Sequence, residues 1–166
     1  MHTFISAPRE DIFDFVADFA NHVAFTDHYL TDFRLARARS DGLGAAARFL
    51  IGGKQYGEFA IAEYERPRRL GLEGRIGRLG RTSAWVVYDF SRDSPELTRV
   101  ALTAWSEPAT RLDALRESLG ARRRLRRQLK ISLERLRMIF EEPPAAPLAR
   151  ATVAAYEPEK AARFGA

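Results

Sequence analysis

The chain has 166 residues and no cysteine, and 46% of its residues are apolar. This length suits one domain with its own core, since a chain of about 150 residues buries roughly 70% of the surface that its unfolded form exposes. The absence of cysteine excludes disulfides, thiolate metal sites, iron–sulfur clusters and a cysteine nucleophile. The net charge of +5 is uneven, because residues 1–109 carry a net −1 and residues 110–142 carry a net +5.

The first residues are typical of a short strand followed by two helices. The strand ends near Ile5, and Pro8 lies in the first turn of the following helix. Apolar residues at positions 12, 15, 16 and 19 follow helical spacing and form one face. A second short helix or turn over residues 21–30 is rich in aromatic residues and contains Phe25, His28 and Tyr29.

From Thr31 onward apolar and polar residues alternate, which predicts about six strands up to residue 104. Turn signals separate these strands, among them Asp41-Gly42, Gly52-Gly53 and the polar residues 91–96. Successive hairpins favour an antiparallel sheet. With the N-terminal strand, the sheet would have about seven strands.

Leucines recur in one broad stripe over residues 110–140, which predicts a long amphipathic helix. That stripe must be buried, and the concave face of the sheet is the available partner. The sequence therefore predicts an α+β fold in which a curved antiparallel sheet wraps around a C-terminal helix, with two short helices after the first strand. Pro143-Pro144 ends the long helix, so we expect a domain over residues 1–142 and an extended or disordered tail, rich in alanine and proline, over residues 143–166.

Cofactor and metal motifs give little support to enzymatic chemistry. Gly42-x-Gly44-x-x-Ala47 has the spacing of a dinucleotide-binding fingerprint, but a strand follows it where that motif needs a helix, so we interpret it as a hairpin turn. His22 and His28 lie six residues apart and would need a third ligand to hold a metal. We expect neither a metal nor a cofactor, and the candidates for acid–base catalysis are His28 and Tyr29.

Four segments together resemble a known family: Ile5-x-Ala7-Pro8-x-x-x-Ile12-Phe13, Glu63-Tyr64-Glu65-Arg66-Pro67-Arg68-Arg69-Leu70, Leu97-Thr98-Arg99-Val100 and Leu129-x-x-x-Leu133-Glu134-x-Leu136. In this order and spacing they are similar to the START-like, helix-grip superfamily, which includes polyketide cyclase/dehydrases, lipid-transfer proteins and pollen-allergen-type proteins. The resemblance covers about residues 3–140 and implies a cavity between sheet and helix. Members range from ligand carriers to cyclases, and some act on ribosomes or regulate partners, so the resemblance implies no single function.

The inward faces of the predicted elements are the candidate walls of a cavity, since ligand pockets are mostly apolar with a few polar anchors. At about 100° per residue, Arg122 and Arg126 lie on or beside the leucine stripe. They either clamp a carboxylate or phosphate at one end of the cavity or are solvated beyond the end of the sheet. The expected ligand-binding residues are Phe25, Tyr29, Phe49, Phe59, Leu72, Val86, Tyr88, Leu102, Leu115, Leu119, Arg122 and Arg126.

Three functions fit these observations. The first is binding of a hydrophobic or amphipathic small molecule or lipid, with an acidic group if the arginines face it. The second is a cyclase/dehydrase acting on an aromatic or polyketide substrate, which requires at least two of His28, Tyr29, Tyr88 and Arg126 to converge in one pocket. The third is an interaction module in which the basic helix binds RNA, a ribosome or a protein.

Nucleic acid is the less favoured partner, because no aromatic residues are interleaved with the arginines to stack on bases. Trp85 and Trp105 should point outward from neighbouring strands, either as scattered surface aromatics or as a homodimer interface. No stretch approaches the ~20 apolar residues of a membrane helix, and the N-terminus lacks a signal-peptide pattern. We therefore expect a cytoplasmic protein without a membrane span.

Overall fold

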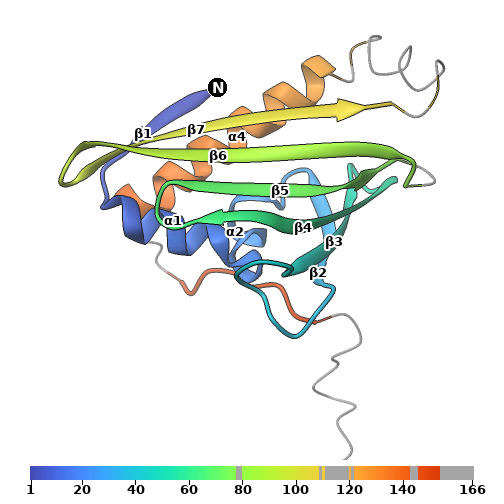
Figure 1. Ribbon diagram of the computed structural model, residues 1–166, viewed down its shortest axis with the longest axis horizontal. Coiled ribbons are helices and arrows are strands. Elements are labelled where there is room, and N and C mark those ends of the chain that lie inside the picture. The colour runs from blue at the N-terminus through green and yellow to red at the C-terminus, as the bar shows by residue number, and fades with distance from the viewer. Residues whose placement is uncertain (78–79, 109, 111–119, 121, 143–145, 154–166) are drawn as a thin grey trace, which may run out of the picture.

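The computed structural model describes residues 1–77, 80–108, 110, 120, 122–142 and 146–153. The chain forms a seven-stranded sheet with its helices packed on one face (Figure 1). In chain order the elements are β1 (His2–Ile5), α1 (Arg9–Ala17), the 3-10 helix η1 (Phe19–Asn21), α2 (Val23–Thr26), β2 (Leu30–Leu35), β3 (Ala46–Ile51), β4 (Gln55–Glu65), β5 (Arg69–Ile76), β6 (Thr82–Ser94), β7 (Leu97–Glu107) and α4 (Arg122–Glu141).

The sheet is antiparallel throughout, and its strand order is β1-β7-β6-β5-β4-β3-β2. The predicted α+β fold is confirmed, with its curved sheet, its long C-terminal helix and its short helices after the first strand. Gly42 and Gly44 lie in the loop between β2 and β3 with φ of 73° and 79°, a conformation that glycine adopts at little cost. The interpretation of this segment as a turn is therefore confirmed, since strand β3 follows it.

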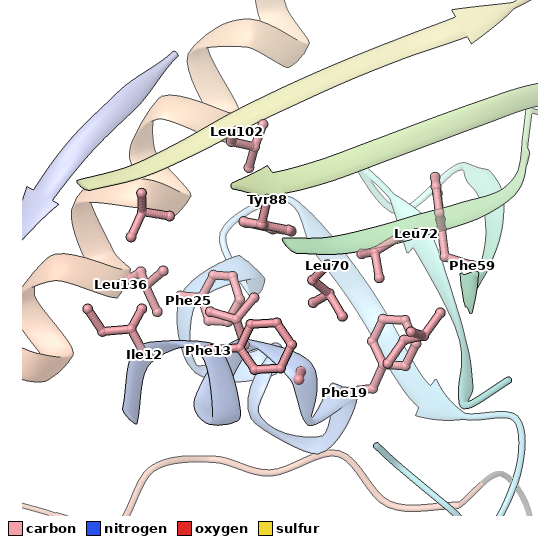
Figure 2. Packing of buried hydrophobic residues seen from close by; sticks show 14 of the residues in the cluster. Ile12, Phe13, Phe19, Phe25, Phe59, Leu70, Leu72, Tyr88, Leu102 and Leu136 are labelled. Atoms are coloured by element: carbon pink, nitrogen blue, oxygen red, sulfur yellow. The ribbon is translucent and has the colours of Figure 1, made fainter. Parts of the chain in front are cut away.

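The core lies between the concave face of the sheet and the described helices α1, α2 and α4 (Figure 2). Of the predicted apolar face, Ile12 and Val16 are buried on α1 and Phe15 is half-buried. Phe13 packs edge-on against Tyr64 and Phe90. On α4 the buried leucines recur every three or four residues, at Leu129, Leu133 and Leu136. Leu136 is completely buried opposite the N-terminal helices, and α4 joins the core through residues 129–136 (Figure 2).

One local feature differs from the sequence-based expectation. The polar residues 91–96 do not all form a turn, because β6 continues to Ser94 and β7 begins at Leu97. Gly74 lies within β5 and pairs regularly with Phe59 and Ala84. A side chain there would meet the Glu58 carbonyl oxygen at 2.0 Å and the Phe59 Cα at 2.8 Å, so the close approach of β4 requires glycine.

Residues 146–153, which we call the C-terminal strap, run back beside η1 and β2. The amide of Ala151 donates to the Ala20 carbonyl at 2.8 Å, and the Leu35 amide donates to the Thr152 carbonyl at 2.8 Å. Arg150 forms an ion pair with Asp18 at 2.6 Å. Part of the predicted tail is therefore extended and attached to the edge of the sheet.

Within the described part of the chain, no helix combines the length and the apolar character needed to cross a membrane.

Candidate ligand-binding site

The concave face of the sheet carries a row of stacked phenylalanines from three neighbouring strands. The rings of Phe33 and Phe49 lie 5.5 Å apart and those of Phe49 and Phe59 lie 5.8 Å apart, with planes within 11° of parallel. Glycines lie under the rings, because a Cβ at Gly57 would approach Phe49 Cε2 to 2.3 Å. The large rings therefore lie flat against positions where the neighbouring strand has no side chain.

Beyond these rings the central strands present smaller residues, which leave apolar surface accessible. Ala84 on β6 pairs with Gly74 on β5, and Val86 on β6 pairs with Ala104 on β7. Val86 is only half-buried and Ala104 is exposed, although both lie on the face that elsewhere forms the core. The described part of α4 begins at Arg122 and contacts β1 and α2, so it does not cover this region.

Three side chains with hydroxyl groups, Tyr29, Tyr88 and Ser132, lie where this apolar surface approaches α4. Tyr88 on β6 lies two residues from Val86 and close enough to Tyr29 for the two phenols to interact electrostatically. Burial raises the pKa of Tyr29 to about 12, and a hydrogen-bonding interaction with the Ser132 side chain opposes this shift. Burial also raises the pKa of Tyr88, so both phenols stay protonated and can donate hydrogen bonds.

His28 extends this polar cluster. Its ring centroid lies 4.8 Å from that of Tyr29, and its Nε2 lies 3.2 Å from the Gln128 carbonyl, which also accepts from the Ser132 hydroxyl at 3.2 Å. A carbonyl partner fixes the proton on Nε2, which leaves Nδ1 as an acceptor. That Nδ1 is buried and has no hydrogen-bond partner among the described residues. Desolvation is the main cause that lowers the pKa of His28, so the ring is neutral at pH 7.

The structure places most of the predicted ligand-binding residues together in the core. Those residues are Phe25, Tyr29, Phe49, Phe59, Leu72, Val86, Tyr88 and Leu102. Leu115 and Leu119 lie outside the described residues. Arg122 and Arg126 are exposed and form no ion pair with a described residue.

Ser132 and the Gln128 carbonyl were missed by the sequence analysis. Ser132 lies between two buried leucines and is itself buried, so a small polar residue within the leucine stripe was the available signal. The backbone carbonyl carries no signal in a sequence, because every residue has one. The four residues proposed for catalysis separate into two groups, since His28, Tyr29 and Tyr88 lie near one another and Arg126 is exposed.

His22 lies in the hydrophobic core and does not belong to the polar cluster of His28, Tyr29 and Tyr88. It is buried among Phe19, Phe25 and Phe33, and its Nε2 lies 2.7 Å from the Val16 carbonyl. No group of three metal-ligating side chains occurs among the residues that the structure describes.

The fold of this chain is similar to that of many solved structures. The KanY protein superposes with a TM-score of 0.65 at 13% identity, covering 85% of this chain and 94% of that one. A protein from Chromobacterium violaceum superposes with a TM-score of 0.63 at 14% identity, covering 85% of this chain and 95% of that one. The di-domain ARO/CYC StfQ of the steffimycin biosynthetic pathway gives 0.60 at 16% identity, covering 85% of this chain and 44% of its own.

The chain has the helix-grip fold. No protein-family model and no curated protein sequence matches it. Because the identities of these structures are below 25%, their likeness establishes the helix-grip architecture alone.

Proposed function

We propose that this helix-grip protein binds a hydrophobic or amphipathic small molecule between the concave face of the sheet and the C-terminal helix. The observation that supports this most is the accessible apolar surface of Val86 and Ala104 directly beside the buried Tyr88. Core positions are normally covered, whereas a ligand pocket combines apolar walls with a few polar groups. The resemblance in fold to the ARO/CYC protein StfQ is consistent with such a ligand.

The polar cluster suggests the chemistry of the ligand. Tyr29 and Tyr88 are protonated donors, and the neutral His28 offers an acceptor at Nδ1. Among the described residues, Arg122 and Arg126 are exposed, and Arg135, whose charge acts on His28, forms an ion pair with Asp27. We infer that the ligand presents a neutral carbonyl or hydroxyl group to the tyrosines rather than a carboxylate. The same groups would polarise a carbonyl in a cyclase or dehydrase reaction, which remains the alternative function.

A pair of substitutions on β7 tests the proposed cavity. Ala104→Phe fills the concave face, whereas Thr103→Phe adds the same ring one residue earlier on the outer face, and both positions are exposed. The neutral dye N-phenyl-1-naphthylamine should bind the wild type and Thr103→Phe with enhanced fluorescence, and Ala104→Phe should weaken this binding at least about tenfold, or 1.4 kcal/mol. Equal binding by the two variants, or no binding by the wild type, would contradict the proposal.

A second candidate function rests on the basic half of α4. Arg122, Arg123, Arg124, Arg126, Arg127 and Lys130 are all exposed. None forms an ion pair with a described residue, whereas most of the other described arginines do. Such a cluster fits an acidic partner, whose binding would weaken as salt screens it.

Charge reversal measures the contribution of this cluster. The variant Arg123→Glu/Arg127→Glu should elute from a heparin matrix at markedly lower salt than the wild type. The control Arg75→Glu/Arg81→Glu makes the same change in net charge on two other exposed arginines and should elute closer to the wild type. Identical elution of both double variants would show that only net charge matters and would remove the argument for a specific acidic partner.

A further inference from the structure

The outer face of the sheet, opposite to the helices, carries both tryptophans of the chain. Trp85 on β6 and Trp105 on β7 are direct cross-strand partners, and their rings lie 5.8 Å apart with planes 11° from parallel. Trp105 is 45% exposed. Neither belongs to the core, so two large aromatic side chains face the solvent where the fold does not require them.

Next to the indoles lies a shallow depression of about 210 Å³. Its floor contains Gly71 and Val87, which pair across β5 and β6, and the tryptophans form one wall. A side chain at Gly71 would meet the Cβ of Glu63 at 2.8 Å, so the approach of β4 keeps this position a glycine. The depression thus results from a small residue between strands that carry large side chains on either side.

Among the described charged groups around the depression, one carboxylate forms no ion pair. Arg69 lies between Glu63 at 2.8 Å and Asp89 at 2.7 Å, and these contacts occupy its guanidinium. Glu73 also lines the depression and pairs across the sheet with Trp85, yet it forms no ion pair with a described residue. These four charged groups sum to a net charge of −2, although the whole chain is basic.

We propose that this depression binds an organic cation, an alkylated ammonium or a guanidinium group, against the tryptophans and Glu73. A cation is attracted to the face of an aromatic ring, most strongly to that of tryptophan, and a nearby carboxylate supplies the opposite charge. The volume suits the head group of such a cation rather than an extended chain. This site lies on the opposite face of the sheet from the proposed cavity and is independent of it.

The same cationic group can come from two sources, a free small molecule or a side chain of another protein copy. The exposed arginines of α4 would supply a guanidinium in the second case, through a head-to-tail contact between copies. Both sources use the same recognition chemistry, and their dependence on protein concentration distinguishes them.

Intrinsic fluorescence excited at 295 nm tests the site directly, because the only two tryptophans of the chain belong to it. Choline should give a saturable change at millimolar concentrations and at constant ionic strength. Its neutral isostere 3,3-dimethylbutan-1-ol should bind at least about fivefold more weakly. Equal binding of the two compounds, or a change that sodium chloride reproduces, would overturn the proposal.

Two variants assign the binding to the carboxylate. Glu73→Gln should weaken choline binding at least about threefold, whereas Glu96→Gln, an exposed acid in the β6–β7 turn, should leave it unchanged. Unchanged binding in Glu73→Gln would reject the carboxylate as a recognition element. The Ala104→Phe variant should bind choline normally, so the outer site and the proposed cavity can fail separately.

Sedimentation velocity then identifies the source of the cation. Association of the wild type that choline reverses and Arg123→Glu/Arg127→Glu removes would assign the site to a neighbouring copy. A monomer that binds choline would assign it to a free small molecule. A monomer without saturable choline binding would overturn both assignments.

Discussion

Replacing Leu136 with alanine is expected to lower the free energy of unfolding by about 2–5 kcal/mol. Leu136 is completely buried on α4, where it faces Ile12 and Phe25 in the centre of the core (Figure 2). Removing its side chain loses the transfer free energy of the buried carbons and leaves a cavity that the fixed sheet and helices cannot fully close. Urea unfolding at pH 7.5, followed by circular dichroism, measures this loss.

Met138→Ala is the matched control for this substitution. Met138 lies two residues further along the same helix and is 45% exposed, so the same kind of truncation should change the stability by no more than about 0.5 kcal/mol. Similar losses in the two variants would mean that α4 is not attached to the sheet through Leu136, and the packing described above would be wrong.

Stability should also fall as the pH is lowered from 7.5 to 5, and His22 should account for about 2 kcal/mol of that loss. Burial is the main cause that lowers the pKa of His22 in the folded protein, from 6.5 to about 4. Above pH 6.5 the ring is neutral in both states and the contribution is fully present. Between pH 6.5 and 4 the unfolded chain binds a proton that the folded one rejects, so the stability decreases through this window.

The variant His22→Gln isolates this contribution, since an amide can still donate to the Val16 carbonyl but does not titrate. Its unfolding free energy should change less than that of the wild type between pH 7.5 and 5. Measurements should stop at pH 5, because the pKa values of Glu10 and Asp14 are also lowered, by a backbone hydrogen bond at Glu10 and by the Arg66 guanidinium at Asp14. Equal pH dependence of variant and wild type would show that His22 is not protected from protonation.

The strands and helices could be predicted from the sequence because the residue patterns that indicate them are local and periodic. The alternation from Thr31 onward and the helical spacing of Leu129, Leu133 and Leu136 each record which face is buried. The need for glycine at position 74 could not be predicted, because its reason lies on another strand, in the approach of the Glu58 carbonyl. The attachment of the C-terminal strap could not be predicted from the sequence either, because it depends on backbone hydrogen bonds to Ala20 and Leu35.

The candidate site was predictable in its apolar part and not in its polar part. Inward positions such as Phe49, Phe59 and Tyr88 follow from strand alternation, and they gather in one cluster. The rotation of α4 decides whether an arginine near its leucine stripe reaches the interior, and the helical spacing alone left both possibilities open for Arg122 and Arg126. Ser132 meets Tyr29 only through the packing of α4 on α2, for which a sequence contains no distance information.

The C-terminal strap has a consequence for how these molecules meet one another in concentrated solution. β2 ends the sheet on one side, and an uncovered outermost strand offers its amides to a strand from another molecule. The Thr152 carbonyl already occupies the Leu35 amide, and a parallel bridge joins Leu35 to Val153. The chain thus terminates its own sheet at this end, which keeps a second molecule from continuing the ladder at Leu35.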